Sequence, residues 1–420
     1  MTRQITFIVI FFLLLILALR FFFLYHNRSK LYNGQEVSFE ETLLGEPQIS
    51  GQFQKFSANY ANGERISITI PRYPEFGYAQ TLKITGTIKS QLLKNGNVII
   101  TMFLPKIEAV QNYENLTTFP IKFILAVTSF VRQNMISLFE KTLPPTSASL
   151  LLGIVFGIKG EMPTDFLDNL RMSGVMHVIA ASGMNVTMTG GFLFAVFSVL
   201  LKRRMALLVS IFGLIFYAVL SGLQPSILRA TIMGILVFSA QILGRQTLAS
   251  YALILAGYIM LFISPLLLFD IGFQLSFLST LGILYLKPFF GKSVFIDDVS
   301  TTFSAQIMTL PVLLSNFGSY SLLSVLVNAL VLWTVPFLMI LGALGAIFGM
   351  VAGFAGQLFL YLSFPLLLYF EKVVDFFAKL GGLISIATLP WQIIFGYYVI
   401  IFSAVIFLRQ RFNQNRKNAK

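Results

Sequence analysis

Long apolar stretches separated by short polar connections make up most of this 420-residue chain. Residues 5–25 read ITFIVIFFLLLILALRFFFLY, which is long enough to cross a bilayer and has no small-residue cleavage pattern after it, so we predict an uncleaved membrane anchor. Apolar runs of comparable length recur towards the C-terminus and bring the expected total to about ten spans. The further spans are predicted near residues 176–201, 205–221, 227–243, 248–263, 266–286, 303–317, 322–350, 351–370 and 391–407.

A polar segment, residues 33–118, interrupts this apolar pattern. It contains short alternating runs such as ERISITI, LKITGTIKS and NVIITMF, which are separated by the turn signals ANGE and KNGN. About five short strands in a segment of this length predict a small β-barrel of the OB type. A generic small β-domain explains the pattern equally well.

Three further segments have a helical pattern but do not qualify as spans. Residues 121–141 are apolar with four charged residues spaced through them, which favours an interfacial amphipathic helix that ends before a Pro-Pro pair. Residues 147–158 are too short to cross a bilayer, so they predict a half-helix that other protein segments cover or that lines a cavity. Residues 373–380 predict a surface helix.

Composition supports a membrane protein and removes several classes of site. The chain is 56% hydrophobic and only 11% charged, whereas soluble globular domains have about 25% charged residues. We therefore predict a polytopic α-helical membrane protein. Since the chain has no cysteine and only two histidines, His26 and His177, it offers no disulfide or thiolate metal site and too few imidazoles for a multi-histidine zinc site. We expect neither a metal nor another cofactor.

The net charge of +13 is concentrated at positions that flank the apolar runs. Positive clusters lie in the C-terminal RQRFNQNRKNAK, in the KRR that begins at Lys202 and close to the first apolar run, whereas residues 33–118 hold seven basic and eight acidic residues. Lys and Arg favour the cytoplasmic ends of spans. The pattern predicts a multi-pass protein of the inner (cytoplasmic) membrane with both termini in the cytoplasm and the β-rich segment outside.

One stretch, SGVMHVIAASGMNVTMTGG, carries more polar groups than a segment in hydrocarbon normally does. On a single helix, at about 100° per residue, His177, Ser182, Asn185 and Thr189 share one face. Glycines beside them, including Gly183, allow a close backbone approach or a bend. Either Ser182 and Thr189 only bond to their own helix, or this face lines or gates a path.

A rival interpretation is an intramembrane serine hydrolase in which Ser182 is the nucleophile and His177 the base. Residues five apart on one regular helix do not meet, because helix neighbours are three or four apart. Only a break at Gly183 would bring the two side chains together, and no third group that would orient the histidine is evident. We therefore assign no catalytic residue and expect no enzyme, with the hydrolase as the alternative.

Three further polar clusters lie on separate predicted spans, in SGLQPSILRATIMG, SPLLLFDIGFQLSFLSTLG and SAQIMTLPVLLSNFGSYSLLSVLVNAL. Either Arg229 and Asp270 pair across helices, or Arg229 faces an aqueous path and contacts a phosphate. Pro311 and Pro336 predict broken helices around a cavity, as in transporters. The residues of these clusters that we expect to line or gate a path are Gln224, Arg229, Asp270, Gln274, Ser276, Gln306, Asn316 and Asn328.

These stretches together resemble the ComEC family of competence proteins. GVMHVIAASG matches the family's Gly-x-x-His-x-x-Ala-x-Ser-Gly motif, PSILRA its Pro-Ser-x-x-Arg-Ala helix, and SPLLLFDIGFQLSFLST its Asp-x-Gly-Phe-Gln-Leu-Ser-Phe stretch, in the family's order. The resemblance covers about residues 147–345, including a similar lead-in, ASLLLGIVFGIKGEMPTDFLDNLRMSG. The upstream β-rich segment resembles the family's extracellular OB-like domain.

The resemblance implies an inner-membrane channel that passes single-stranded DNA into the cytoplasm during natural transformation. The implied partners are single-stranded DNA, the lipid bilayer and other competence proteins, including a separate ATPase or DNA receptor, since the chain has no Walker motif. A homo-oligomer is compatible with this interpretation. The other transport alternative is a carrier of another anionic polymer or lipid.

One departure from the family concerns its nuclease. Many members end in a metallo-β-lactamase-like domain, whereas this sequence has no His-rich zinc motif. We therefore expect a short form without the nuclease, in which another protein degrades the second strand.

The resemblance also suggests a division of the chain into five parts. These are an N-terminal membrane anchor at residues 1–30, an OB-like β-domain at 31–119, an interfacial amphipathic helix at 120–145, a competence-type transmembrane channel domain at 146–410 and a basic cytoplasmic tail at 411–420. Because the β-domain has almost no net charge, its grip on single-stranded DNA would depend on aromatic stacking. The stacking candidates are Phe53, Phe56, Tyr60, Tyr73 and Phe76.

Overall fold

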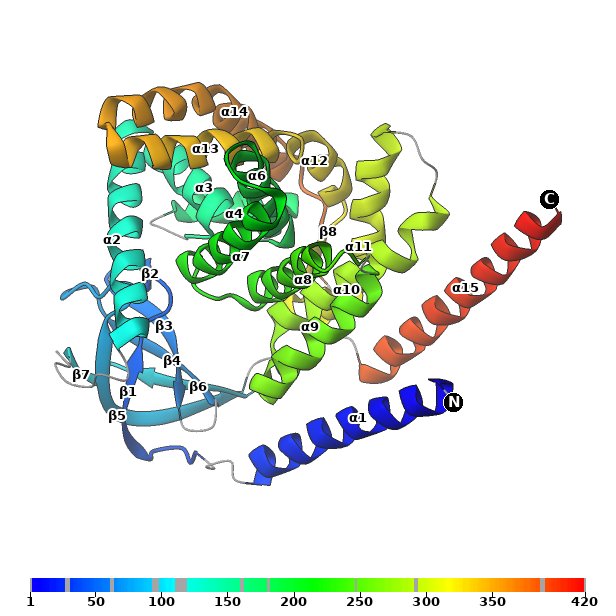
Figure 1. Cartoon of the computed structure of the whole chain (residues 1–420). Coiled ribbons are helices and arrows are strands. Elements are labelled where there is room, and N and C mark those ends of the chain that lie inside the picture. The colour runs from blue at the N-terminus through cyan, green and yellow to red at the C-terminus, as the bar shows by residue number, and fades with distance from the viewer. Residues whose placement is uncertain are drawn as a thin grey trace.

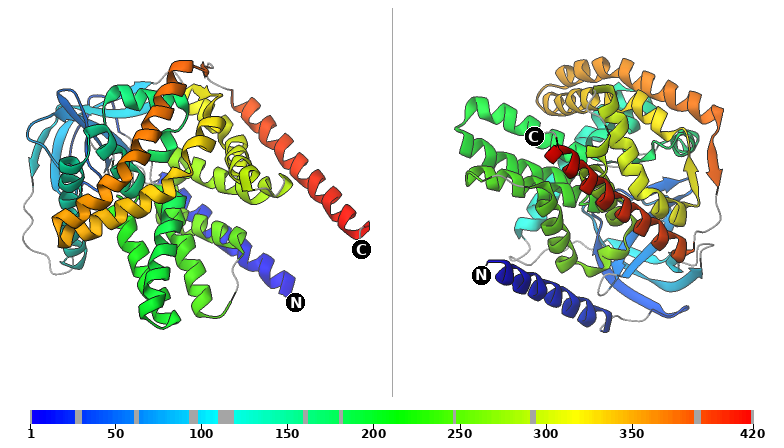
Figure 2. Two further views of the ribbon diagram at one scale, coloured as in Figure 1. Left: turned by 90° about the horizontal axis from the view of Figure 1, so that it is seen from above. Right: turned by 90° about the vertical axis from the view of Figure 1, so that its right-hand side faces the viewer.

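A computed structural model describes residues 2–26, 31–60, 64–92, 98–109, 119–158, 162–179, 182–245, 248–290, 294–385 and 390–418. Within these residues, a β-sheet near the N-terminus is followed by a large assembly of helices (Figure 1). The helices at the two ends, α1 (Thr2–His26) and α15 (Trp391–Asn418), lie at the periphery of this assembly (Figures 1 and 2). The fold is thus mostly helical, as the apolar runs predict.

The N-terminal sheet curves into a half-barrel around its own apolar core. Its strand order is β1-β5-β6-β4-β3-β2, with β7 paired to β5, and the β4–β6 pair is parallel. Ile66, Ile68 and Ile70 alternate with polar residues along β4 and are buried, which is the pattern of a strand with one face on a core. The three runs ERISITI, LKITGTIKS and NVIITMF form β4, β5 and β6 as predicted, but the described residues of this segment hold seven strands, not about five. Their bounds are β1 Glu36–Thr42, β2 Gln48–Ser50, β3 Phe53–Tyr60, β4 Glu64–Pro71, β5 Thr81–Leu92, β6 Val98–Phe103 and β7 Lys106–Ala109.

The helical assembly follows the sheet through α2, which stands between the sheet and the other helices (Figure 1). Pro145 and Pro225 lie in the first turns of α3 and α8, where a missing backbone N–H breaks no intrahelical bond. The first helices are α2 Phe119–Thr142, α3 Pro145–Phe156, α4 Thr164–Ser173, α5 Met176–Ile179, α6 Gly183–Leu200, α7 Arg203–Leu220 and α8 Pro225–Ile242. The later elements are α9 Ala249–Ile263, η3 Pro265–Phe269, α10 Ile271–Tyr285, η4 Lys287–Phe289, α11 Val294–Phe317, β8 Ser319–Ser321, α12 Ser324–Val331, α13 Thr334–Val351, α14 Gly353–Leu380 and β9 Leu383–Ser385.

Five helices in the described part of the chain are long and apolar enough to cross a membrane: α6, α7, α8, α13 and α14. Shorter apolar helical segments occur in α1, α3, α9 and α15. The expected total of about ten spans therefore stays a prediction.

Helix α3 is at the centre of the helical core. Every residue from Ser147 to Phe156 is buried. Its Val155 and Leu151 side chains pack against Gly342 of α13, and Ile179 of α5 packs against its Gly153. A helix too short to span is thus enclosed by other helices, as the sequence predicts for residues 147–158.

Two predicted spans do not form single helices, because each is divided. The expected helix of residues 176–201 begins only at Gly183, since Ser182 has an extended backbone (φ −107°, ψ 167°) and precedes the first turn of α6 as its N-cap residue. In the expected span of residues 266–286, Asp270 accepts a hydrogen bond from the Phe273 backbone N–H at 2.9 Å and so starts α10 after the short η3 helix.

Proline divides a third predicted span, at residues 322–350. Pro336 has no N–H to donate to the carbonyl of Leu332, and the chain separates there into α12 and α13. The expected break between a span at 351–370 and a surface helix at 373–380 is absent, because α14 continues to Leu380. Its acidic residues are held by polar groups, with Ser147 Oγ donating to Glu371 at 2.6 Å and Asn169 Nδ2 to Asp375 at 2.9 Å.

Two other expectations need correction. Helix α2 forms as predicted for residues 121–141, but its Arg132 is only 3% exposed and does not belong to a solvated charged face. The helix break predicted at Pro311 is absent, because α11 continues through this proline from Val294 to Phe317. Helix α15 continues to Asn418 and includes most of the predicted basic tail, whose boundary at residue 411 stays a prediction.

Candidate functional site

Arg229 on α8 is a buried cation with neutral partners. The residue is 7% exposed. Its Nε donates to Ser276 Oγ of α10 at 2.7 Å, and its Nη1 donates to Met233 Sδ at 3.3 Å. Its guanidinium carbon lies 6.0 Å from the centroid of the Phe277 ring. Because α8 is a candidate span and charge is costly at membrane depth, Arg229 is the strongest functional candidate in the helices.

The N-terminus of α6 lies directly against this arginine. A Cβ built on Gly183 would be 2.7 Å from Arg229 Nη2 and 3.5 Å from Ala230 Cβ. The glycine therefore allows the guanidinium to approach the first turn of α6, where the Asn185 N–H donates to the Ser182 carbonyl at 3.1 Å and the Gly183 and Met184 N–H groups come before the first intrahelical bond. Ser182, Gly183, Arg229 and Ser276 are referred to below as the Arg229 site.

Asn185 connects this site to the central helix. Its side chain is 1% exposed. Its Oδ1 accepts from Ser182 Oγ at 2.9 Å, and its Nδ2 donates to the carbonyl of Ile154 at 2.6 Å, in the last turn of α3. Asn185 thus satisfies a helix-terminal carbonyl and positions Ser182, a structural role that the helical-face argument did not predict.

Arg229 and Asp270 do not form the ion pair that the sequence left open. In the described part of the chain no carboxylate pairs with Arg229, which donates to Ser276 and Met233. Asp270 Oδ1 accepts from the Phe273 N–H, and Gln274 Nε2 donates to the carbonyl of Leu268 at 2.9 Å. Asp270 and Gln274 therefore shape the start of α10.

A second polar group surrounds the start of α12. Gln306 Nε2 donates to Ser324 Oγ at 3.0 Å, and Tyr320 OH donates to Gln306 Oε1 at 2.8 Å. Asn328, one turn after Ser324, is fully buried, and its side-chain amide has no hydrogen-bond partner within the described residues. Asn316 donates to the carbonyl of Val312 in its own helix at 2.9 Å.

The remaining path candidates share no hydrogen bond with the Arg229 site in the described residues. His177 is exposed and lies on the one-turn helix α5, so it is not on the same helix as Asn185. Thr189 and Gln224 are half-buried, the first within α6 and the second just before α8. The shared face predicted for His177, Ser182, Asn185 and Thr189 is wrong, because it assumed one continuous helix.

The aromatic residues of the N-terminal sheet divide into two groups. Phe56, Tyr60 and Phe76 pack against the core of the sheet. Tyr73 is 72% exposed and has Arg72 5.7 Å from its ring centroid, and Phe53 lies 5.8 Å from the exposed ring of Phe103. The solvent-facing rings therefore include Phe103, which the sequence argument missed and which ends an alternating strand.

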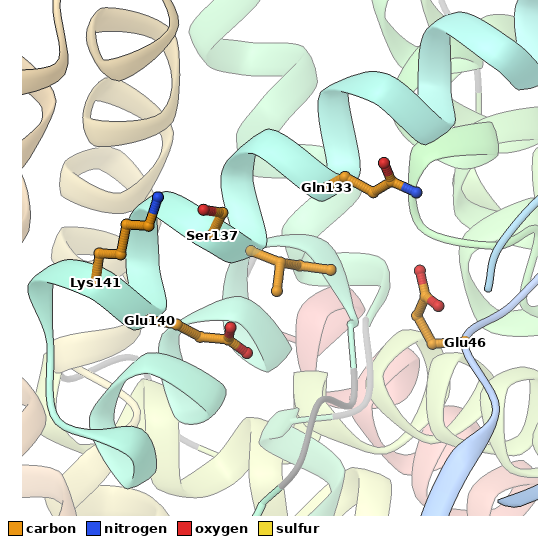
Figure 3. A pocket seen from close by; sticks show the side chains of 6 residues that line it. Glu46, Gln133, Ser137, Glu140 and Lys141 are labelled. Carbon is orange, nitrogen blue, oxygen red and sulfur yellow. The ribbon is translucent and has the colours of Figure 1, made fainter. Parts of the chain in front are cut away.

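An acidic cleft separates the N-terminal sheet from α2. A cavity of about 340 Å³ is lined by Glu46, Gln133, Glu140 and Lys141 among others, and Glu46 faces α2 across it (Figure 3). An adjoining cavity of about 650 Å³ also contains Glu75 in its wall. With three carboxylates in its walls, this cleft is less suited to a nucleic-acid strand than the Arg229 site is.

Sequence reasoning missed the partners that complete the Arg229 site. Met233 lies one turn after Arg229, at a spacing that places both on one helix face. The ring of Phe277 and the carbonyl of Ile154 come from other helices. Phe277 ends the Asp-x-Gly-Phe-Gln-Leu-Ser-Phe stretch, but the sequence does not show that either group meets Arg229 or Asn185.

The comparisons with known proteins match the part of the chain that contains this site. The Competence protein family model matches residues 154–411, which include all of the Arg229 site. ComE operon protein 3 of Bacillus subtilis (strain 168) is 26% identical over 244 residues, which are 57% of this chain and 31% of that protein. An uncharacterized protein of Aquifex aeolicus (strain VF5) is 32% identical over 143 residues, 33% of this chain and 34% of that protein.

The aligned region spans about a third of the length of each of these curated relatives. No solved structure matches. Since the family model covers more than half of the sequence, the chain belongs to the Competence protein family.

Proposed function

We propose that this membrane protein conducts single-stranded DNA into the cytoplasm during natural transformation. Membership of the Competence protein family supports a role in DNA uptake. The observation that carries the proposal is the Arg229 site, in which a cation of the candidate span α8 is held by neutral groups and lies against a second candidate span, α6. A polyanion passing this point would supply the negative charge that the protein does not.

The path proposed for the strand uses polar residues of several helices. Helix breaks before Gly183 and before Thr334 support a path lined by non-helical backbone, as in transporters. The proposed lining or gating residues remain His177, Ser182, Gly183, Asn185, Thr189, Gln224, Arg229, Asp270, Gln274, Ser276, Gln306, Asn316 and Asn328.

The N-terminal sheet is proposed to be an OB-like domain that receives the strand outside the membrane. Its order β1-β5-β6-β4-β3, with a parallel β4–β6 pair, supports a partly open Greek-key barrel. Bases would stack on exposed rings such as Tyr73. Phe56, Tyr60 and Phe76 are partly buried, so only the exposed parts of their rings would contact the strand. About ten spans with both termini in the cytoplasm complete this arrangement.

The proposed partners follow from the same function. They are single-stranded DNA, the bilayer, and other competence proteins, including a separate ATPase or DNA receptor, and the chain is compatible with a homo-oligomer. A carrier of another anionic polymer or lipid would use the same cation, so the nature of the cargo decides between the two.

The test is uptake of labelled DNA in cells that lack the gene and carry wild-type or variant copies. We expect Arg229→Lys to retain much more uptake than Arg229→Gln, because a phosphate contact depends on positive charge. Gly191→Ala is the control, since a Cβ on Gly191 of α6 meets nothing within 4 Å. Full uptake in the absence of the gene, with normal levels of the other components, would refute the proposed function.

A further inference from the structure

The charge of Arg229 is not balanced by any acidic side chain in the described residues. A buried charge without a partner strongly destabilises a protein. Its neighbour adds to the imbalance, because the N-terminus of an α-helix carries roughly half a positive charge. Helix α6 is 18 residues long and starts at Gly183, the residue that the guanidinium approaches. The Arg229 guanidinium and the positive end of α6 thus lie side by side without a negative group to balance them.

The hydrogen-bond donors of Arg229 are only partly used. Nε is used by Ser276 and one N–H of Nη1 by Met233. Nη2, the atom that lies against Gly183, has no hydrogen-bond partner within the described residues. Its two N–H groups and the Gly183 and Met184 N–H groups are therefore available to one ligand, whereas the Asn185 N–H already donates to the Ser182 carbonyl at 3.1 Å.

The α6 side of the site is less buried than the α8 side. Ser182 and Gly183 are half-buried, and Met184 is 39% exposed, although Arg229 behind them is buried. The first turn of α6 is therefore the side from which a ligand would approach Nη2. A side chain at position 183 would displace Nη2, since even a methyl group would lie 2.7 Å from it.

We propose that Nη2 of Arg229 and the first turn of α6 bind one singly charged tetrahedral oxyanion, of the phosphodiester type. A tetrahedral group can accept from the guanidinium and from helix N-terminal N–H groups at once. Two sources share this chemistry: the backbone of a DNA strand and the headgroup of an anionic phospholipid. The DNA source rests on the proposed function, whereas the oxyanion site itself does not.

The experiment uses the full-length protein in nanodiscs of neutral lipid. Its thermal unfolding midpoint is measured alone, with inorganic phosphate, with oligo(dT), and in nanodiscs that contain phosphatidylglycerol. A ligand that binds only the folded state raises this midpoint. The variants are Gly183→Ala and Arg229→Gln, with Gly191→Ala of the same helix as the matched control.

We expect phosphate to raise the midpoint of the wild type and of Gly191→Ala, and to have no effect on Arg229→Gln or Gly183→Ala. If oligo(dT) raises the midpoint of the wild type but not of these two variants, the site is assigned to the DNA strand. If only phosphatidylglycerol shows this difference, the site is assigned to lipid. If Gly183→Ala fails to fold, Arg229→Gln still decides. Without any anion, Arg229→Gln should be at least as stable as the wild type, because it removes an unbalanced charge.

Two results would overturn the inference. One is an equal anion effect in all variants. The other is a midpoint of Arg229→Gln far below that of the wild type without anion, which would make Arg229 a structural donor to Ser276. A protein that binds phosphate here but takes up no DNA would refute the proposed function and leave this site intact.

Discussion

Arg132 Nε on α2 lies 3.4 Å from Glu46 Oε1, in the loop between β1 and β2, and this ion pair joins the helices to the N-terminal sheet. The guanidinium also lies 4.4 Å from the ring centroid of Tyr78, and its Nη1 donates to the carbonyl of Leu220 at the end of α7. Tyr78 OH donates to the Val219 carbonyl at 2.9 Å. Burial lowers the pKa of Arg132, and Glu46 opposes this shift.

This connection reaches the helix that carries the Arg229 site. Leu220 ends α7, and Pro225 begins α8 after a short turn. The N-terminal sheet therefore supports the start of α8 through α2 and the end of α7.

The first prediction concerns the ion pair itself. Glu46→Gln leaves the buried Arg132 without its counter-charge and should destabilise the protein by roughly 1–3 kcal/mol, less than for a fully buried pair because Glu46 is partly exposed. Thermal unfolding in nanodiscs measures the effect. Glu108→Gln removes the exposed ion pair with Lys106, at 2.8 Å, and should have no measurable effect. Equal midpoints for the two variants would contradict this prediction.

The second prediction is a pH dependence that arises from Glu41. Burial raises the pKa of this carboxyl above 4.5, while hydrogen bonds from Asn59 oppose the shift. Between the two pKa values the folded state holds a proton that the unfolded state has lost. Glu41 therefore contributes stability that is present below pH 4.5 and lost as the pH rises through the raised pKa.

Replacing the Glu41 carboxyl by an amide should remove this loss of stability at higher pH. We expect Glu41→Gln to have a higher unfolding midpoint than the wild type at neutral pH and the same midpoint in acid. Glu40→Gln, at the exposed neighbouring position, is the control. A Glu41→Gln midpoint that falls with pH as steeply as that of the wild type would show that another group is responsible.

The third prediction concerns the contact between α13 and α14. A Cβ on Gly356 would lie 2.4 Å from Gly349 Cα and 2.6 Å from the Gly345 carbonyl oxygen, both backbone atoms. Gly356→Ala must therefore separate two helix backbones, which typically costs about 1–3 kcal/mol. Gly353→Ala in the same helix meets nothing within 4 Å and should be neutral or slightly stabilising. Similar midpoints for these two variants would mean that the helices do not pack so closely.

The fourth prediction separates transport from hydrolysis. Ser182 Oγ donates to Asn185 Oδ1 at 2.9 Å, and no hydrogen bond joins it to His177 in the described residues. Ser182→Ala should therefore reduce stability by about 0.5–1.5 kcal/mol and leave DNA uptake largely intact. Labelling with a fluorophosphonate probe tests the hydrolase directly. Labelling of the wild type that disappears in Ser182→Ala would establish a nucleophilic serine.

The fifth prediction concerns the orientation in the membrane. Since the chain has no cysteine, single cysteines at Tyr73 and Asn418 can be labelled without background. Tyr73 is 72% exposed in the N-terminal sheet, and Asn418 ends α15. We expect an impermeant thiol reagent to label position 73 in intact cells and position 418 only after lysis, as charge distribution predicts. The reverse pattern would invert the proposed topology.

The sequence by itself determined the local features of this protein. The alternation of isoleucines in ERISITI predicts a strand with one buried face, because successive side chains of a strand point to opposite sides. Pro225 predicts the start of α8, because proline fits the first turn of a helix. The motifs around His177, Arg229 and Asp270 identified the family. Each of these features depends on neighbouring residues in the chain.

Only the tertiary structure decided which of these features meet. Arg229 and Asp270 are charged residues of two predicted spans, yet Arg229 bonds to Ser276 while Asp270 caps α10. Arg132 looks like one charge of an amphipathic helix, but it is buried against Glu46 and Tyr78. Periodicity shows which face of a helix a residue is on, whereas the partner on that face is set by how distant segments pack.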